Sequence, residues 1–247
     1  MITEYFNKIT ELLKKVYESQ EDVLDEAAER ISQAIQGDGI IHLYGCGHSH
    51  ILTEEVFYRA GGLVPIRPIF HEPLMLHEGA MRSSMIERRN DYAKNFMLDQ
   101  DIIDKDVFII ISTSGRNPVP IDAALIAKEK GAFVIGITSR EYSNSEESRH
   151  ESGKRLYDVV DLVIDNYSSV GDALLNHELV SEPFAPSSTV VGATILNAIL
   201  AEAIVKMAKN DYTPPIFLSG NLAGSDDHNL QLVEKYKKRI PLLTEGL

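Results

Sequence analysis

The hydrophobic and polar positions of the chain change their period near residue 40. Over residues 2–36, apolar side chains recur every three or four positions, as on one face of a helix. The polar run over residues 19–22 interrupts this pattern, so we expect two helices with a break near Ser19. Gly37-Asp38-Gly39 then ends the second helix.

After residue 40, short apolar runs alternate with longer segments of mixed polarity. The runs predict strands, and the segments between them predict helices. Expected strands cover residues 40–44, 64–69, 107–111, 133–137 and 159–164, and expected helices cover residues 50–60, 118–130, 190–208 and 229–239. Strands separated by helices of this length indicate βαβ units, in which helices cover both faces of a parallel sheet. We therefore predict an α/β fold with a doubly wound parallel sheet.

Two stretches show no regular pattern. Residues 139–158 are polar and rich in Ser, Glu and Arg, as expected for a solvated loop. Residues 70–106 hold several His, Glu and Arg side chains and are long for a structureless connection, and such loops are often functional. A further break is expected at Thr213-Pro214-Pro215. The expected parts are N-terminal helices, one α/β domain and a C-terminal segment, over residues 1–36, 37–212 and 213–247.

The composition limits the partners of this chain. Its 247 residues carry 24 Lys and Arg against 37 Asp and Glu, a net charge of −13, which disfavours nucleic acid and anionic membranes. A single Cys excludes a disulfide framework and fits a reducing compartment. No stretch has the basic and apolar layout of a signal peptide or the roughly 20 apolar residues of a membrane span. We expect a soluble cytoplasmic protein with no nucleic-acid or membrane partner.

Three loops place small or hydroxyl-bearing residues where a helix is expected to begin. They are Gly45-Cys46-Gly47-His48-Ser49, Ser112-Thr113-Ser114-Gly115-Arg116-Asn117 and Pro186-Ser187-Ser188-Thr189. Backbone N–H groups at a helix start favour an anion, hydroxyls add donors, and glycine lets the backbone come close. In an open α/β sheet these loops lie at the carboxyl edge, where ligands bind. Capping explains any one loop, but three together favour a phosphate site.

Nucleotide binding fits the sequence less well. In the pattern Gly-x-Gly-x-x-Gly the third glycine is replaced by His50, and no acidic residue ends the second expected strand. The P-loop pattern Gly-x-x-x-x-Gly-Lys-Ser/Thr does not occur. We therefore expect neither NAD(P) binding nor nucleotide hydrolysis, and we predict no cofactor.

The first two loops resemble those of the sugar isomerase (SIS) domain family, which pairs Gly-x-Gly-x-Ser with Ser-x-Ser-Gly-x-Ser/Thr on a flavodoxin-like sheet. Residues 45–49 match the first pattern in full, and residues 112–115 match the core of the second. Asn117 stands where the family usually has Ser or Thr. The resemblance covers about residues 35–210 and is closest to phosphosugar isomerases, including phosphoheptose isomerases. It implies that a substrate phosphate is held by Gly47, Ser49, Ser112, Ser114, Asn117, Ser187, Ser188 and Thr189.

The acid and base groups of an isomerase are harder to assign. Phosphoheptose isomerases carry a Glu about three turns into the helix after the first loop, and that place falls on Arg59 here. Candidate catalytic groups instead follow the second expected strand: His71, Glu72 and His77. Five of the eight histidines lie between residues 42 and 77, although a surface loop is the alternative. His42 itself is expected to be a core histidine.

The sequence supports three further expectations about individual side chains. A zinc site built from His71, His77 and a carboxylate lacks the usual ligand spacing, so no metal is predicted. Glu54 and Glu55 are expected in a charged first helical turn. His177 and His228 are expected at the surface, from which either could reach the site of a neighbouring subunit.

We predict from these features that the chain binds a phosphorylated sugar and interconverts its aldose and ketose forms through an enediol. Apolar positions such as Tyr5, Leu12 and Leu13 are numerous for a free helix, so a homodimer or homotetramer is expected. Two alternatives stay open: a non-catalytic phosphosugar sensor, and a lyase or etherase acting on an N-acetyl amino-sugar phosphate. Sensors of this kind carry a helix-turn-helix domain first, whereas only about 36 residues precede the first expected strand.

Overall fold

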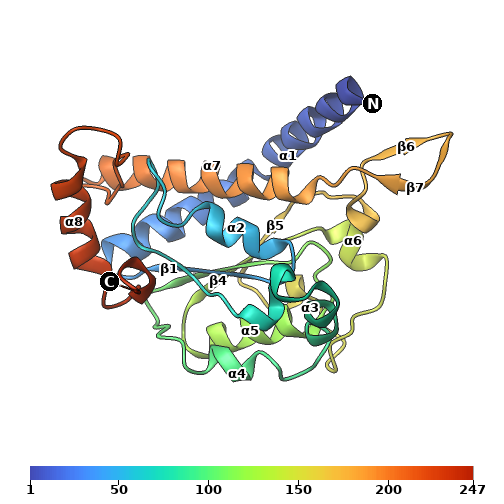
Figure 1. Ribbon diagram of the computed structural model, residues 1–247, viewed down its shortest axis with the longest axis horizontal. Helices are drawn as coiled ribbons and strands as arrows, with labels where there is room; N and C mark the ends of the chain where they lie inside the picture. The colour runs from blue at the N-terminus through green and yellow to red at the C-terminus, as the bar shows by residue number, and fades with distance from the viewer. Residues whose placement is uncertain (247) are drawn as a thin grey trace.

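The computed structural model describes residues 1–246 and shows an open parallel sheet with helices on both faces (Figure 1). The strand order is β2-β1-β3-β4-β5, and every neighbouring pair is parallel. The strands are β1 (Ile41–Gly45), β2 (Ile66–Pro68), β3 (Val107–Ile111), β4 (Phe133–Thr138) and β5 (Leu162–Asp165). This is the flavodoxin-like order, so the predicted doubly wound α/β fold is confirmed.

Eight α-helices within residues 1–246 surround this sheet (Figure 1). They are α1 (Ile2–Gln36), α2 (Ser49–Glu55), α3 (Ala80–Ile86), α4 (Lys94–Met97), α5 (Pro118–Glu129), α6 (Arg140–Asn144), α7 (Ser188–Lys209) and α8 (Ser225–Tyr236). A two-stranded antiparallel hairpin, β6 (Leu175–His177) and β7 (Val180–Phe184), projects beside the start of α7.

The alternation of side chains along the strands divides the core into two layers. In β3, Val107 and Ile109 pack with α1, α2 and α7 on one face, whereas Phe108 and Ile110 pack with α4 and α5 on the other. Figure 1 shows α1, α2 and α7 on one side of the sheet and α4 and α5 on the opposite side. Because both faces are covered, all five residues of β3 are buried.

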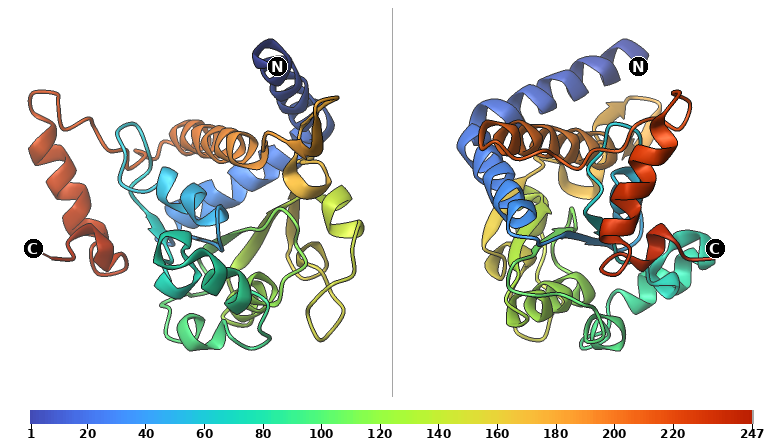
Figure 2. Two further views of the ribbon diagram at one scale, coloured as in Figure 1. Left: turned by 45° about the vertical axis from the view of Figure 1, so that its right-hand side comes forward. Right: turned by 90° about the vertical axis from the view of Figure 1, so that its left-hand side faces the viewer.

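The predicted break in the N-terminal helix is present one residue after Ser19. Gln20 has non-helical dihedrals (φ −140°, ψ 21°) inside α1. Its side-chain amide donates to the carbonyl oxygen of Asp165 at 2.7 Å, and its amide oxygen accepts from the Asp165 N–H at 2.7 Å. These two bonds hold the kink against the end of β5, so the first half of α1 projects away from the sheet (Figures 1 and 2).

Helix α7 is the only helix within residues 1–246 that is long and apolar enough to cross a membrane. Its side chains Val191, Ile195 and Ile199 are almost fully buried in the layer that it shares with α1 and α2. Length and composition alone are weak evidence, since the core helix of a soluble protein meets the same criterion.

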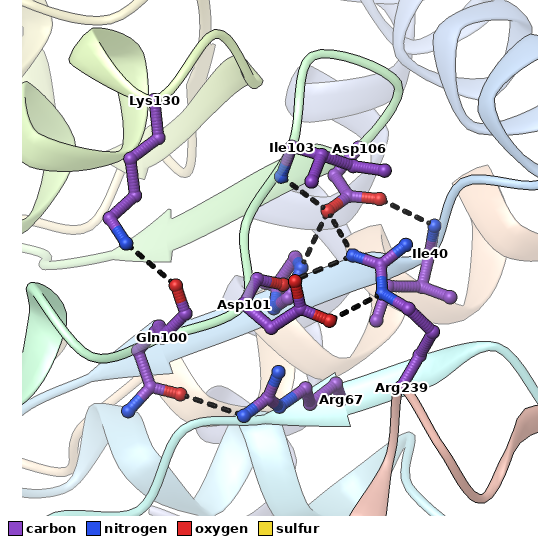
Figure 3. Close-up of polar contacts among 9 residues, drawn as sticks. Ile40, Arg67, Gln100, Asp101, Ile103, Asp106, Lys130 and Arg239 are labelled. Atoms are coloured by element: carbon purple, nitrogen blue, oxygen red, sulfur yellow. Dashed lines mark hydrogen bonds and ion pairs between the residues drawn. The ribbon is translucent and has the colours of Figure 1, made fainter.

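The C-terminal segment packs against the amino edge of the sheet, opposite the expected site. Val233, Tyr236 and Ile240 form a small core with Ile40 of the strand entry. Arg239 contacts the carboxylate of Asp101 at 2.8 Å and that of Asp106 at 2.7 Å, as Figure 3 shows. The segment is therefore fixed by both apolar packing and a charged cluster.

His42 is the buried core histidine that the sequence predicted. Its Nε2 lies 3.0 Å from Oδ2 of Asp106, its side chain is fully buried, and its ring stacks on Phe108. Burial lowers the pKa of His42, and Asp106 partly opposes this effect. The other ring nitrogen, Nδ1, has no hydrogen-bond partner within residues 1–246.

The structure corrects several boundaries. The helix after the first loop ends at Glu55 instead of continuing to residue 60, so Glu54 and Glu55 lie in its last turn and the first-turn prediction is wrong. The last helix starts at Ser225 rather than at residue 229. The stretch over 70–106 is not irregular, because it contains two 3-10 turns as well as α3 and α4. The β6–β7 hairpin was not predicted.

Candidate functional site

The first two loops begin side by side at the carboxyl edge of the sheet. Gly45 pairs with Ile111 in the register of β1 and β3, so the chain leaves both strands at neighbouring points. Gly47 (φ +55°) and Gly115 (φ +57°) adopt the left-handed conformation that glycine favours and turn each loop back over the edge. This position between β1 and β3 is the switch point at which flavodoxin-like folds bind their ligands.

Three serine hydroxyls in these loops have free donor capacity. Within residues 1–246, the hydroxyls of Ser49 and Ser114 make no hydrogen bond, and that of Ser112 only accepts one from the Gly115 N–H at 3.3 Å. No side-chain cap bond is present at the starts of α2, α5 or α7. Capping, the alternative explanation for these polar residues, therefore does not account for them.

Asn117 occupies the N-cap position of α5 that the sequence predicted, but its side chain has other partners. Its amide oxygen accepts from Nη1 of Arg149 at 2.9 Å. The same side chain lies near the carboxyl group of Glu87 and lowers its pKa. Asn117 thus joins the second loop to two charged groups from distant parts of the chain.

The third cluster is occupied by a carboxylate of the chain itself. Oδ1 of Asp172 accepts from the N–H groups of Ser187 and Ser188 at 3.0 and 2.9 Å, and the two hydroxyls donate to the same carboxylate at 3.0 and 2.5 Å. Thr189 is half-buried, and its hydroxyl has no partner in the described chain. The donors at the start of α7 therefore already hold an anion.

Part of the segment after β2 lies against the first loop. The N–H of Gly47 donates to the carbonyl oxygen of Leu74 at 3.2 Å, so this donor is not free for a ligand. The ring of His77 lies 5.9 Å from that of His50, whose Nδ1 contacts the Gly47 carbonyl at 2.5 Å. His77 and Glu72 are exposed near this loop, as expected for groups that meet a ligand.

His71 points in a different direction. Its Nε2 contacts the hydroxyl of Tyr92 at 3.0 Å, and its ring stacks on Phe96 with 4.5 Å between centroids. Burial lowers the pKa of His71, with a smaller opposing effect from Glu72. The structure therefore brings Glu72 and His77 toward the first loop and packs His71 among aromatic side chains.

Glu87 is a candidate that sequence reasoning did not single out. It follows α3 directly, and its carbonyl oxygen accepts from the N–H of Val119 in α5 at 3.3 Å. Burial raises the pKa of its carboxyl group, whereas Asn117 and the nearby arginines lower it. A partly buried carboxyl group with a raised pKa beside a ligand loop is a typical acid or base. No local pattern marks it, because only the fold brings residue 87 to residue 117.

Other residues considered from the sequence lie away from these loops. Arg59 lies beyond the end of α2 and pairs with Glu55. His228 binds the Ile216 carbonyl at 2.9 Å on the α8 side of the molecule, and His177 is exposed in the β6–β7 hairpin. Cys46, by contrast, belongs to the first loop, where it is buried 3.1 Å from the Tyr44 hydroxyl, and burial raises its pKa well above the ordinary value.

No metal cluster marks this site within the described residues, and a sizeable hollow lies elsewhere. No three His, Cys, Asp or Glu side chains within residues 1–246 come together as metal ligands do. A hollow of about 460 Å³ lies instead between Tyr58, Phe217 and α8, near the C-terminal segment. Chemistry, not cavity size, therefore distinguishes the loops over residues 45–49 and 112–117.

The fold and these loops define a doubly wound α/β protein with a hydroxyl-lined ligand edge at the β1–β3 switch point. The SIS domain model matches residues 4–139. A UPF0309 protein of Halalkalibacterium halodurans is 66% identical over 243 residues, covering 98% of this chain and 97% of its own. A UPF0309 protein of Listeria innocua is 59% identical over 247 residues and covers both chains fully. The chain belongs to the SIS domain family.

Solved structures share the fold at low sequence identity. Phosphoheptose isomerase from Neisseria gonorrhoeae has a TM-score of 0.52 at 16% identity, covering 84% of this chain and 97% of that chain. The sugar isomerase domain of an RpiR transcription factor from Sphaerobacter thermophilus has a TM-score of 0.51 at 15% identity, covering 96% and 98%. These likenesses support the SIS fold.

Proposed function

We propose that this chain binds a phosphorylated sugar between the loops of residues 45–49 and 112–117 and interconverts its aldose and ketose forms. The observation that carries the proposal is the group of three serine hydroxyls, Ser49, Ser112 and Ser114, with free donors at the switch point. A phosphate accepts several hydrogen bonds at once, so free hydroxyls on two neighbouring loops are suited to it. Family membership adds support, since neighbours with this fold include a phosphoheptose isomerase.

The bulk charge of the chain does not oppose this role. Binding a small phosphate needs only local donors and one or two nearby cations, whereas a polyanion needs a broad basic surface. With a net charge of −13, we expect the protein to discriminate against nucleic acid and to accept a sugar phosphate.

The start of α7 is not the main phosphate site in this proposal. Asp172 occupies the Ser187 and Ser188 donors, so a ligand would have to displace this carboxylate before binding there. Thr189 keeps a free hydroxyl beside it. We therefore assign the phosphate to the first two loops, with Asn117 positioning the second of them.

The reaction needs a base that moves a proton between adjacent carbons. Glu72 and His77 face solvent beside the first loop, and Glu87 lies beside the second. Glu87 combines partial burial with a contact to Asn117, which makes it the strongest base candidate of the three. His71 then serves as a positioning residue, because Tyr92 and Phe96 fix its ring.

Removing two hydroxyls tests the binding site. We expect Ser112→Ala with Ser114→Ala to weaken binding of fructose 6-phosphate by about 100-fold or more, because two hydrogen bonds to a charged group are lost and each costs about 1.5–3 kcal/mol. Isothermal titration calorimetry measures this change, and circular dichroism checks the fold. Ser219→Ala, near α8, is the matched control. Equal affinity of the double variant and the control would contradict the anchoring role.

Exchange of protons with solvent distinguishes isomerisation from the two alternatives, the lyase or etherase and the non-catalytic sensor. We expect NMR in D₂O to show deuterium entering C1 or C2 of a bound sugar phosphate, as an enediol intermediate requires. Elimination products would support the lyase or etherase alternative, and tight binding without exchange would support the sensor. The neighbour NanR from Vibrio vulnificus, solved with ManNAc-6P, keeps the sensor alternative relevant (TM-score 0.50, 15% identity, 98% of this chain and 69% of that chain).

A further inference from the structure

Three arginines from distant parts of the chain meet beside the second loop. Arg116 belongs to the loop itself, Arg88 follows α3, and Arg149 lies in the loop after α6. The N–H of Arg149 donates to the carbonyl oxygen of Arg116 at 2.9 Å, and Nη1 of Arg149 donates to Asn117 at 2.9 Å. Partial burial lowers the pKa of Arg149, and repulsion by Arg116 and then Arg88 lowers it further.

The backbone holds these segments together. The N–H of Glu151 donates to the Asn90 side chain at 2.9 Å, which ties the Arg149 loop to the chain just after α3. The N–H of Val119 donates to the carbonyl oxygen of Glu87, so Arg88 is held near the start of α5. The cluster is therefore a product of the fold and not of one flexible loop.

The charge of this cluster is only partly neutralised by the protein. Arg116 reaches the carboxylate of Glu146 at 3.6 Å and the carbonyl oxygen of Glu147 at 2.9 Å. Arg88 and Arg149 have no ion pair within 4 Å in the described chain. The partly buried carboxyl group of Glu87 raises the pKa of Arg149, but by less than burial and the two other arginines lower it. A bound anion would stabilise positive charges that lie this close together.

The cluster also lies at the right distance for one end of a ligand. Ser114 and Arg116 are two residues apart, so their Cα atoms are separated by at most about 7 Å. A sugar phosphate held by Ser112 and Ser114 can therefore extend its other end toward the arginines. Arginine forms paired hydrogen bonds to carboxylate and phosphate, the anionic groups that sugars carry.

We propose that Arg88, Arg116 and Arg149 bind a second anionic group, so that the ligand is a phosphorylated sugar that also bears a carboxylate or a second phosphate. This inference rests on the proposed function, because it assumes that the first phosphate lies at Ser112 and Ser114. It narrows the substrate class from sugar phosphates in general to those with two anionic groups.

Calorimetric titration of the full chain with three probes tests the inference. Fructose 6-phosphate carries one anionic group, 6-phosphogluconate adds a carboxylate, and fructose 1,6-bisphosphate adds a second phosphate. We expect one of the last two to bind at least about tenfold more tightly than fructose 6-phosphate. The better of the two identifies the second group as carboxylate or phosphate.

The variant Arg88→Gln assigns the effect to the cluster, and Arg149 is left unchanged because it also holds the Asn117 side chain. We expect this variant to lower the affinity for the preferred probe toward that for fructose 6-phosphate. The affinity for fructose 6-phosphate should stay within about twofold of its value for the unchanged chain. Arg89→Gln removes the same charge one residue away and serves as the matched control. Arg116 is left unchanged because it also holds the loop at Glu147.

Two results would overturn the inference. If fructose 6-phosphate binds and neither doubly charged probe binds more tightly, or if Arg88→Gln keeps the preference in full, the arginines bind no second group. If no probe binds at all, the proposed function fails and this inference fails with it. Where fructose 6-phosphate binds, its loss in Ser112→Ala with Ser114→Ala shows that the proposed function holds even if this inference fails, because that variant tests the first phosphate alone.

Discussion

The carboxyl group of Glu87 lies between the end of α3 and the second loop, where burial raises its pKa. A raised pKa means that the folded chain holds this proton more tightly than the unfolded chain does. Its effect on stability is therefore most favourable below the unfolded pKa and is lost as pH rises through the folded pKa. The carboxylate form at neutral pH destabilises the fold, as is common for groups retained for function.

We expect Glu87→Gln to raise the melting temperature at pH 7 and to flatten its fall as pH rises above the unfolded pKa of the carboxyl group, because glutamine keeps the contact with Asn117 without a charge. Activity should drop by about 100-fold or more if Glu87 is the base. Thermal melts across pH and exchange rates in D₂O measure both effects. Glu72→Gln, at an exposed carboxyl, is the control for stability. A lower melting temperature at pH 7 would contradict this account of Glu87.

Asp106 has the opposite electrostatic balance. Burial raises its pKa, but hydrogen bonds from His42, Arg239 and two backbone N–H groups outweigh burial and lower the pKa to about 2. The stability that it contributes is present above the unfolded pKa and is lost as pH falls toward about 2. We expect Asp106→Asn to cost about 3 kcal/mol at pH 7, since it leaves Arg239 and His42 poorly paired. Urea unfolding at pH 7 and pH 3 checks this, and an unchanged midpoint at pH 7 would contradict it.

The sequence predicted some residues of the candidate site and missed others. Ser49, Ser112 and Ser114 were predicted because loops that follow parallel strands share one edge of the sheet. Glu87 and Arg149 were not predicted, since their contacts with Asn117 join residues more than 25 positions apart. The hydrogen bond from Ser187 to Asp172 could not be predicted either, because Asp172 belongs to a turn that has no recognisable sequence pattern.

Gly45 controls how the first loop leaves β1. A Cβ atom at this position would lie 2.7 Å from Cβ of Ser49 and 2.8 Å from its carbonyl oxygen, closer than real Cβ contacts. We expect Gly45→Ala to displace Ser49 and to weaken sugar-phosphate binding by about tenfold, with a loss of about 1–3 kcal/mol in stability. Gly220→Ala, which meets no atom within 4 Å, is the control. Titration calorimetry with equal affinities for the two variants would contradict the prediction.

Strand and helix types followed from the sequence more reliably than their ends did. The buried runs over residues 107–111 and 133–137 were predicted almost to the residue, since apolar strands covered on both faces have a strong pattern. The end of α2 at Glu55 was not predicted because no glycine or proline occurs in residues 56–60, and Tyr58 in that stretch takes a left-handed conformation (φ +46°). The β6–β7 hairpin was missed because its strands are short, largely exposed and without a glycine turn.

The molecule as a whole presents a projecting N-terminal helix, visible in Figures 1 and 2. Leu12 is buried in the core of its own chain and Tyr5 binds the Pro186 carbonyl, so these two residues do not call for a partner. Phe6 and Ile2 indicate a partner surface instead, because these large apolar residues are 68% and 80% exposed. We propose that this face mediates a homodimer or homotetramer.

We expect size-exclusion chromatography with light scattering to give the mass of at least a dimer, and Phe6→Glu to shift it toward 27.5 kDa. A charge in an apolar interface is costly to bury, which is the reason for the shift. Asn7→Glu adds the same charge at an exposed position of this half of α1 that lies about 100° around the helix from Phe6, and it is the control that should keep the larger mass. A monomer before any substitution would contradict the prediction.

The central claim concerns where a sugar phosphate binds, and a crystal structure of the full chain with fructose 6-phosphate tests it most directly. We predict phosphate oxygens within about 2.5–3.2 Å of the hydroxyls of Ser49, Ser112 and Ser114, with the sugar directed toward Glu87. A phosphate bound at the start of α7 in place of Asp172, or in the hollow beside α8, would contradict the account.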